Sequence, residues 1–181
     1  MKPLYDLKEI DPSRVHRLFY PDVPAILCAS HQGRISAMPV VSYASVSEVP
    51  SLVAVSCAPG AFTYLVIAKS KHFSLCFLDR DQTRALEFLA THSGRGTTDK
   101  LADSGLSHRR GEKLDVPVIK ESMAALECSL WARRRLGDHV LVVGKVEAAE
   151  ASADFADYWR FRRYKPILYT GWQGRLTTFG A

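Results

Sequence analysis

The stretch that decides the fold is AALECSLWARRRLGDHVLVVGKVEAAEA, residues 124–151. In AALECSLW, the apolar side chains at even-numbered positions alternate with a mixed set that includes Glu127 and Ser129 at odd-numbered positions. This period of two is typical of a half-buried strand. The second half, VLVVGKVEAAEA, is apolar on both faces from Val140 to Val143 and then alternates with charged residues. Gly137 and Asp138 lie between the halves and are typical turn residues. The stretch therefore predicts two long antiparallel strands joined as a hairpin.

Further strands are predicted on both sides of this hairpin. Before it, AILCAS and ISAMPVVSY form a predicted hairpin that turns at Gly33, and SLVAVSC and HFSLCFL are predicted as single strands. After it, PILYTGWQGRLTTF predicts two short strands around Gly171 and Gly174. The segments span residues 25–30, 35–43, 51–57, 72–78 and 166–179.

Three helices are expected among these strands. DPSRVHRLF has Asp11 as its predicted N-cap and Pro12 as its first helical residue. FTYLVIAKS, residues 62–70, does not alternate and is expected to be a short helix. RDQTRALEFLATHSG has apolar residues at helical spacing, with Asp81 as predicted N-cap and Gly94 as the stop. Many antiparallel strands and few short helices favour an α+β fold, mainly β, in which helices pack outside a closed barrel.

The composition indicates a globular chain that fits one domain, residues 1–181. The chain is 47% hydrophobic and 24% charged. A chain of this length buries roughly 70% of its unfolded surface. No apolar run approaches the roughly 18 residues of a membrane helix, and MKPLYDLKEIDPS at the N-terminus lacks the features of a signal peptide. We therefore expect a cytoplasmic protein without a membrane partner.

Standard nucleotide, metal and hydrolase motifs are absent from the sequence. It contains no G-x-G-x-x-G, G-x-x-x-x-G-K-[ST], H-E-x-x-H or G-x-S-x-G. Its six histidines never come within four positions of each other, and its cysteines form no C-x-x-C pair. We therefore expect no metal site. We interpret the cysteines as buried free thiols: Cys28, Cys57, Cys76 and Cys128.

The net charge of +5 is concentrated in three basic segments. They are SHRRGEK, ARRRLG and YWRFRRYK, residues 107–113, 132–137 and 158–165. The last mixes arginines with aromatic rings, which could hold nucleic acid through phosphate contacts and stacking. No nucleic-acid-binding motif surrounds it, so nucleic acid is not the favoured partner. An anionic small ligand, such as a phosphate-bearing cofactor, accounts for the same charge more simply.

Short hydroxyl side chains are dense where strands are expected to turn. Such hydroxyls, together with backbone N–H groups near a helix start, can hold a phosphate because each donates a hydrogen bond. Serines in turns also satisfy local backbone groups, and the pattern alone does not separate these two interpretations. The residues concerned are Ser42, Tyr43, Ser45 and Ser47 in SYASVSEVP, and Ser56 and Thr63 around the turn at 59–60.

The order of segments in the chain is similar to a known family. The segments are SYASVSEVPSLVAVSCAPGAFTYLVIAKSKHFSLCFL, SGRGTTDKLADSGL, PVIKESMAALECSL, GDHVLVVGKV and PILYTGWQGRL. In this order they resemble the flavin reductase-like family with the FMN-binding split β-barrel, and SGR…DK…GL resembles its ferric reductase and flavoredoxin branch. The resemblance implies an antiparallel Greek-key barrel with short peripheral helices and a homodimer. It also implies FMN, with FAD less favoured, in a groove at or beside the subunit interface.

The resemblance further implies which residues bind the flavin. Thr63 and Lys100 would hold the phosphate end, where a flexible ammonium neutralises a dianion. His139, in GDH, would lie near the flavin ring and the path of the nicotinamide. The full implied set is Ser36, Ser42, Tyr43, Ser45, Ser47, Thr63, Lys100, His139 and Trp172.

The activity implied by the resemblance is hydride transfer from NADH or NADPH to flavin. Electrons then pass to an acceptor, which could be free flavin, a ferric chelate, a nitro compound or a partner protein. His139 is the one implied catalytic residue, as a positioning and charge-tuning group, since imidazole changes charge near neutral pH. A turn or capping histidine is the alternative. Two rival functions stay open: a flavin-binding electron carrier or storage protein without nicotinamide turnover, and a cofactor-free split-barrel module that binds nucleic acid or haem.

Overall fold

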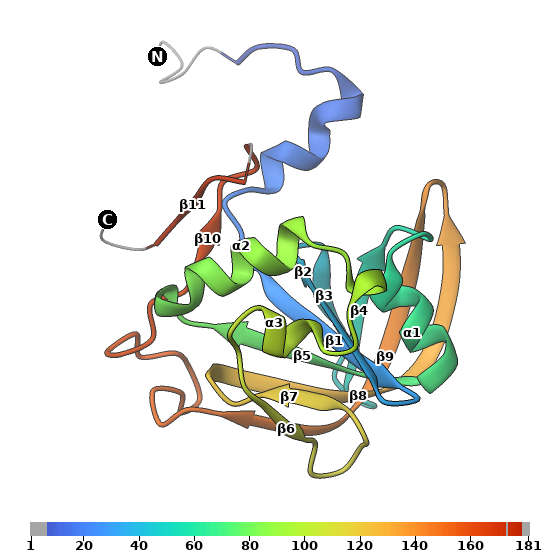
Figure 1. Ribbon diagram of the computed structural model, residues 1–181. Helices are drawn as coiled ribbons and strands as arrows, with labels where there is room; N and C mark the ends of the chain where they lie inside the picture. The colour runs from blue at the N-terminus through green and yellow to red at the C-terminus, as the bar shows by residue number, and fades with distance from the viewer. Residues whose placement is uncertain (1–6, 173, 179–181) are drawn as a thin grey trace.

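A curved antiparallel sheet forms the centre of the molecule (Figure 1). The computed structural model describes residues 7–172 and 174–178. Seven strands pair in the order β2-β1-β5-β8-β9-β4-β3, and each neighbouring pair is antiparallel. Their bounds are β1 Ala25–His31, β2 Arg34–Val40, β3 Tyr43–Ser47, β4 Leu52–Cys57, β5 His72–Leu78, β8 Ser122–Leu136 and β9 His139–Ala151. The predicted α+β fold, mainly β and antiparallel, is confirmed.

The hairpin predicted from residues 124–151 is the pair β8 and β9. Leu136 pairs with His139, so Gly137 and Asp138 are its two turn residues, as predicted. Gly137 has a φ of 59°, in the left-handed region that glycine adopts without steric cost. The first strand runs further than its alternation predicted, because residues 133–135 continue the ladder with β9 as an exposed, arginine-rich arm.

Two of the three predicted helices are confirmed as written. η1 is a 3₁₀ helix, Pro12–Phe19, and the Asp11 carboxylate caps it by accepting a hydrogen bond from the Ser13 N–H at 2.8 Å. α1 is an α-helix, Phe62–Ser70, that packs mainly against β1. In Figure 1, η1 stands away from the sheet.

The third predicted helix is present with different ends. α2 spans Thr83–Thr91 and follows the 3₁₀ turn η2, Arg80–Gln82. The prediction of Asp81 as N-cap is wrong, because the carboxylate of Asp79 caps η2 by accepting from the Asp81 N–H at 3.2 Å. The predicted stop at Gly94 is also wrong, since α2 already ends at Thr91.

Several short elements complete the fold. The two predicted closing strands are β10, Leu168–Tyr169, and β11, Leu176–Thr177, which pair with each other. Phe179, the last residue of that predicted segment, lies outside the described residues. Elements that the sequence pattern did not predict are η3 Gly94–Gly96, α3 Lys100–Asp103, β6 His108–Arg110 and β7 Pro117–Ile119.

The sheet buries apolar side chains on both of its faces. In β1, Leu27 faces a cluster that also contains Phe73 and Val142, whereas Ile26 faces a cluster with Leu89 of α2 and Leu101 of α3. The first cluster includes Val66 and Ile67 of α1, and the second joins the other face of the sheet to α2 and α3. All four cysteines are buried free thiols, as predicted. None of the described helices is long and apolar enough to cross a membrane.

Candidate functional site

Three of the predicted flavin-binding residues meet in one buried cluster. Ser36 of β2 and Thr63 of α1 share a hydrogen bond of 2.8 Å between their hydroxyl oxygens. Lys100 of α3 lies beside them, since an added Cβ on Gly94 would be 2.9 Å from Ser36 Oγ and 3.6 Å from Lys100 Cδ. Ser36, Thr63 and Lys100 are 1%, 2% and 4% exposed, so this cluster joins elements of the fold beneath the surface.

The ammonium of Lys100 is occupied inside the protein. Its Nζ donates to the carbonyl oxygens of Ala37 at 2.8 Å and Leu89 at 2.7 Å, and so links β2 to α2. Burial lowers the pKa of Lys100 to about 8. The ammonium keeps a third N–H donor, but a flavin phosphate could reach it only if this buried side chain became accessible. The phosphate contact of Lys100 therefore stays a prediction, and its described contacts are structural.

The buried position of Lys100 predicts a pH-dependent stability. Its pKa falls from 10.5 to about 8 on folding, so the unfolded chain holds this proton more tightly. Between about pH 8 and 10.5, the unfolded state therefore binds more protons, and the stability contributed at this site rises with pH. Urea unfolding at pH 8 and pH 10 should show wild type gaining stability relative to Lys100→Met, which lacks the titrating group. A constant difference between the two proteins at both pH values would contradict this.

Two arginines, the partly buried Arg34 and the exposed Arg95, form a cationic corner near this cluster. The Arg34 Nη2 donates to the carbonyl oxygens of Gly94, Arg95 and Thr97 at 3.3, 2.8 and 3.1 Å. Arg95 Nη2 donates to the Gly60 carbonyl at 2.8 Å. Both guanidinium groups lie over the Phe62 ring. The distance from Cζ to the ring centroid is 5.0 Å for Arg34 and 5.4 Å for Arg95. We call this set, Arg34, Phe62 and Arg95, the arginine corner.

The arginine corner surrounds the start of α1. No side chain caps this helix at Ala61, so its first backbone N–H groups have no side-chain acceptor. Uncapped N–H groups and the helix dipole attract an anion, and the two guanidinium groups add positive charge. Sequence reasoning missed both arginines, although Arg95 belongs to the SGRGTTDK segment. The signal that could have marked Arg95 is Gly94 beside it: a Cβ there would lie 2.9 Å from Ser36 Oγ, so glycine lets this segment pack closely.

His139 lies at the same end of the sheet as the arginine corner. It opens β9, next to Val140, which pairs with Cys57 at the end of β4. The turn that follows Cys57 leads directly into α1. The ring is exposed, and its Nδ1 lies 2.8 Å from Asp138 Oδ1, a hydrogen bond that lowers the pKa of this carboxyl group. The remaining nitrogen, Nε2, has no hydrogen-bond partner among the described residues and can meet a ligand.

The remaining predicted residues are spread over other parts of the fold, although Ser42 stays near this end: the Ser56 N–H donates to its carbonyl oxygen, and Ser56 pairs with Leu141 of β9. Ser42, Ser45 and Ser47 follow one another along or beside the edge strand β3. Tyr43 instead turns into a cavity, where its hydroxyl donates to the Val23 carbonyl at 2.7 Å. Trp172 is 50% exposed and is held between β10 and β11, with the Arg17 guanidinium 5.7 Å from its ring. One copy of the chain thus brings together only part of the predicted set.

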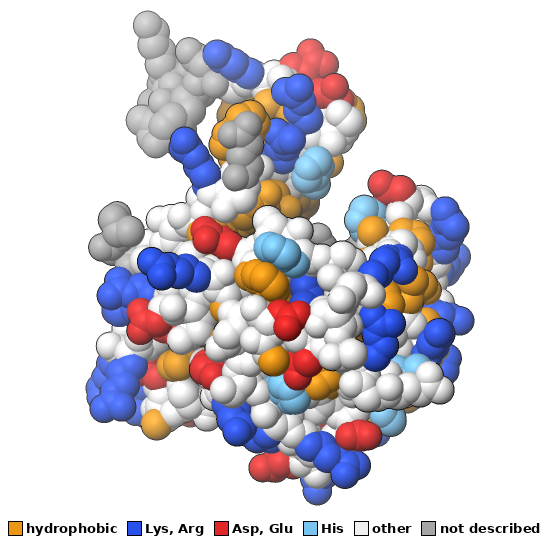
Figure 2. Space-filling model, viewed as in Figure 1, with side chains coloured by type: hydrophobic (Ala, Val, Ile, Leu, Met, Phe, Trp, Pro, Cys, Tyr) orange, Lys and Arg blue, Asp and Glu red, His pale blue; other side chains and the backbone are white. Residues whose placement is uncertain are grey.

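The surface between η1 and the hairpin tip that carries His139 is hollowed. Figure 2 shows a wide recess between η1 and the tip of the β8–β9 hairpin. An antiparallel barrel-like sheet thus carries two arginines, an uncapped helix start and a histidine at one end. Within the described part of the chain, no group of three or more His, Cys, Asp or Glu side chains could hold a metal ion.

Comparison with known proteins identifies the family. The family model described as Flavin reductase like domain matches residues 16–168. The chain therefore belongs to the flavin reductase-like family, a family of oxidoreductases, and the predicted family is confirmed.

Relatives and solved structures agree with this assignment. A protein of Aeropyrum pernix is 32% identical over 91% of this chain and 63% of its own length, so this chain spans less than two thirds of that relative. FMN reductase (NADH) SmoA of Agrobacterium fabrum is 32% identical over 75% of this chain and 74% of its own length. The crystal structure of an FMN-binding protein from Thermus thermophilus, with bound 1-cyclohex-2-enone, matches with a TM-score of 0.80 at 28% identity. It covers 97% of this chain and 95% of that chain, which confirms the predicted split-barrel fold.

Proposed function

We propose that this protein is a flavin reductase that binds FMN and accepts hydride from NADH or NADPH. The observation that carries the proposal is the arginine corner, which lies at the same end of the sheet as His139 in a member of the flavin reductase-like family. A phosphate-bearing flavin needs a cationic site for its phosphate and a second set of groups for its ring. The single compact corner favours FMN over FAD, which carries two phosphates and an adenosine.

The residues present fit a flavin phosphate. Arg95 is exposed, and its guanidinium forms one described hydrogen bond, to the Gly60 carbonyl, which leaves further N–H donors for an anion. The N-terminal N–H groups of α1 would add donors, while Ser36 and Thr63 support this helix from below. We keep Ser36, Ser42, Tyr43, Ser45, Ser47, Thr63, Lys100, His139 and Trp172 as proposed flavin contacts.

A bound flavin supplies the hydride-accepting chemistry, and the protein contributes binding, orientation and exclusion of water. His139 is proposed to orient the ring and the nicotinamide through Nε2, because Asp138 holds Nδ1. No nucleophile is required. The acceptor that we propose is free flavin, a ferric chelate or a partner protein that consumes reduced flavin.

We also propose that the functional unit is a homodimer. η1 buries none of its residues, and Val15, Leu18 and Phe19 are 50%, 64% and 76% exposed. An isolated helix of this length is not stable in water without packing, so this apolar face needs cover. A second copy could cover it and bring Trp172 toward a flavin in the recess of its partner.

Anaerobic mixing tests the proposed function. Purified protein with added FMN should turn yellow, and NADH or NADPH should then bleach the flavin within seconds. Flavin that stays yellow for minutes would favour the electron carrier instead, and a protein that takes up no FMN would remove flavin from its function. Arg95→Ala should weaken FMN binding about tenfold, by loss of a charge-assisted hydrogen bond.

Arg110→Ala is the matched control for this variant. Arg110 is also exposed and lies on β6, where its Nε pairs with Asp115 at 3.0 Å. Exposed pairs of this kind contribute little to stability. FMN affinity should therefore stay at the wild-type value, as measured by fluorescence quenching of the flavin. Equal losses in both variants would mean that general surface charge, and not the arginine corner, attracts the flavin.

A further inference from the structure

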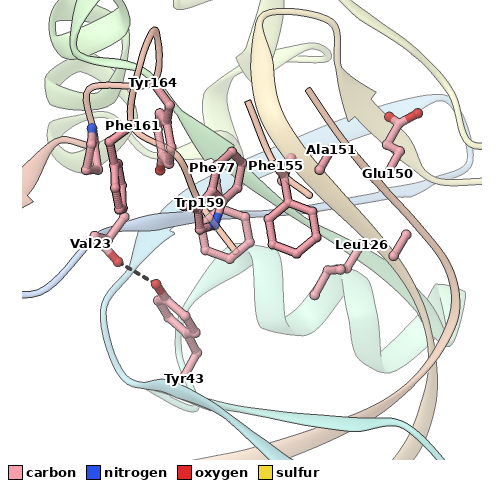
Figure 3. Close-up of a pocket in the computed structure, with 13 residues that line it drawn as sticks. Val23, Tyr43, Phe77, Leu126, Glu150, Ala151, Phe155, Trp159, Phe161 and Tyr164 are labelled. Atoms are coloured by element: carbon pink, nitrogen blue, oxygen red, sulfur yellow. Dashed lines mark hydrogen bonds between the residues drawn. The ribbon is translucent and has the colours of Figure 1, made fainter. Parts of the chain in front are cut away.

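The tip of the β8–β9 hairpin carries three consecutive exposed arginines. We call this set, Arg133, Arg134 and Arg135, the arginine arm. Figure 1 shows the hairpin tip extending past the rest of the sheet, and Figure 2 shows Lys and Arg side chains gathered on that side of the molecule. The far end of β9, at Ala151, instead lines the aromatic cavity of Figure 3. The hairpin tip therefore combines His139 with dense positive charge, away from that cavity.

No carboxylate pairs with the arginine arm within residues 7–172 and 174–178. None of its members belongs to an ion pair, and their one side-chain hydrogen bond runs from Arg135 Nε to the Gly137 carbonyl oxygen at 3.3 Å. The residues opposite them on β9, 140–142, are apolar, and β5 pairs with β8 only as far as Ser129. Like charges this close repel one another, so the arginine arm favours a bound anion.

The strand register places Arg134 near His139. Leu136 pairs directly with His139, and directly opposed residues of an antiparallel pair lie on the same face of the sheet. Arg134 lies two residues before Leu136, so its side chain belongs to this face as well, roughly 7 Å along the strand. An elongated molecule that contacts His139 would therefore bring a second group within reach of the Arg134 guanidinium.

We propose that the arginine arm binds the 2′-phosphate of NADPH and makes NADPH the preferred hydride donor. The preference rests on the proposed function, in which His139 orders the nicotinamide. A phosphate monoester carries about 1.5 to 2 negative charges at neutral pH, and guanidinium groups bind it through paired, charge-assisted hydrogen bonds. NADH has a hydroxyl group at this position and gains no such bonds. The flavin phosphate is assigned to the arginine corner, so the arginine arm is left for a second phosphate-bearing ligand.

The kinetic test compares NADPH with NADH in the anaerobic reduction of the full chain loaded with FMN, followed by stopped-flow absorbance. Wild type should favour NADPH in kcat/KM by at least about tenfold. Arg134→Ala should lower kcat/KM for NADPH about tenfold, mainly through KM, and change the value for NADH less than about twofold. Arg84→Ala is the matched control and should leave both values unchanged. Arg84 is an exposed arginine of α2 and has no ion pair in the described part of the chain.

The outcomes distinguish the phosphate site from the proposed reductase. If wild type reduces FMN equally well with NADH and NADPH, the 2′-phosphate site is wrong and the reductase stands. If Arg134→Ala slows both donors equally, the arginine arm contacts a group that they share, such as the pyrophosphate, and the proposed selectivity is wrong. If neither donor reduces FMN, the proposed function is wrong, and a binding measurement then decides the phosphate site.

That measurement is calorimetric titration of the same protein with 2′,5′-ADP and with 5′-AMP, which lacks the 2′-phosphate. 2′,5′-ADP should bind at least about tenfold more tightly. Arg134→Ala should remove this difference, whereas Arg134→Lys should keep part of it because the positive charge stays. A difference that Arg134→Ala removes supports the phosphate site whether or not the flavin is reduced. Equal affinities of the two nucleotides for wild type, or a difference that survives Arg134→Ala, would overturn it.

Discussion

Gly144→Ala is expected to lower the free energy of unfolding by about 3 kcal/mol, at the upper end of the usual cost of overpacking a core. Gly144 lies in β9, between Leu130 of β8 and Val53 of β4. An added Cβ would overlap the tip of the Phe73 ring and lie 2.9 Å from Cys128 Cβ. Phe73 is fully buried, so its ring cannot move away into solvent. Urea unfolding monitored by circular dichroism measures the loss.

Gly60→Ala is the control for this substitution. Gly60 has no atom within 4 Å of an added Cβ and no positive φ, so its replacement should change stability by less than about 0.5 kcal/mol. In a Phe73→Leu background, Gly144→Ala should cost clearly less than in wild type, because the smaller side chain vacates the contested space. An equal cost in both backgrounds would show that the ring is not the obstacle.

Gly144 shows where prediction from the sequence ends. The alternation in AALECSLW and the turn residues Gly137 and Asp138 are local signals, so both long strands and their turn were predicted correctly. The close approach of Phe73 to Gly144 crosses from β5 to β9, and no local pattern records it. The predicted ends of α2 are wrong for a related reason. Asp79 and Asp81 are equally good capping residues in sequence, but Asp79 caps the 3₁₀ turn η2, and α2 begins after Gln82 without a side-chain cap.

In the candidate site, too, the sequence predicts residues, but their contacts depend on the tertiary structure. Ser36 and Thr63 were both implied as flavin contacts, but their mutual hydrogen bond depends on how α1 packs near β2. Lys100 was predicted as a phosphate ligand, and its burial against two carbonyls follows from α2 and α3 meeting β2. The arginine corner joins Arg34 and Arg95 across distant segments, and only tertiary structure reveals it. The turn at GDH is a local signal and was predicted correctly, whereas the role of His139 in the site stays a prediction.

His139→Ala is expected to slow reduction of bound FMN by NADH or NADPH about 50-fold, while FMN affinity changes less than about threefold. This expectation follows from the position of the His139 ring. Asp138 holds Nδ1 at 2.8 Å and directs Nε2 outward, at the end of the sheet that carries the arginine corner. A group that orders the nicotinamide over the ring contributes to the rate of hydride transfer, whereas phosphate contacts dominate affinity. Stopped-flow absorbance under anaerobic conditions measures the rate, and flavin fluorescence measures the affinity.

His108→Ala provides the comparison for this experiment. His108 also pairs with a carboxylate, since its Nε2 lies 2.8 Å from Asp99 Oδ2, but it belongs to β6 and is not part of the arginine corner or the β8–β9 tip. Its loss should leave the rate of FMN reduction within about twofold of wild type, because it removes one hydrogen bond to a carboxylate that lies away from the hairpin tip. Equal rates in wild type and His139→Ala would remove His139 from the site. Equal slowing in both variants would instead indicate a general effect of losing a paired imidazole, and the geometry at the hairpin tip would then carry no special role.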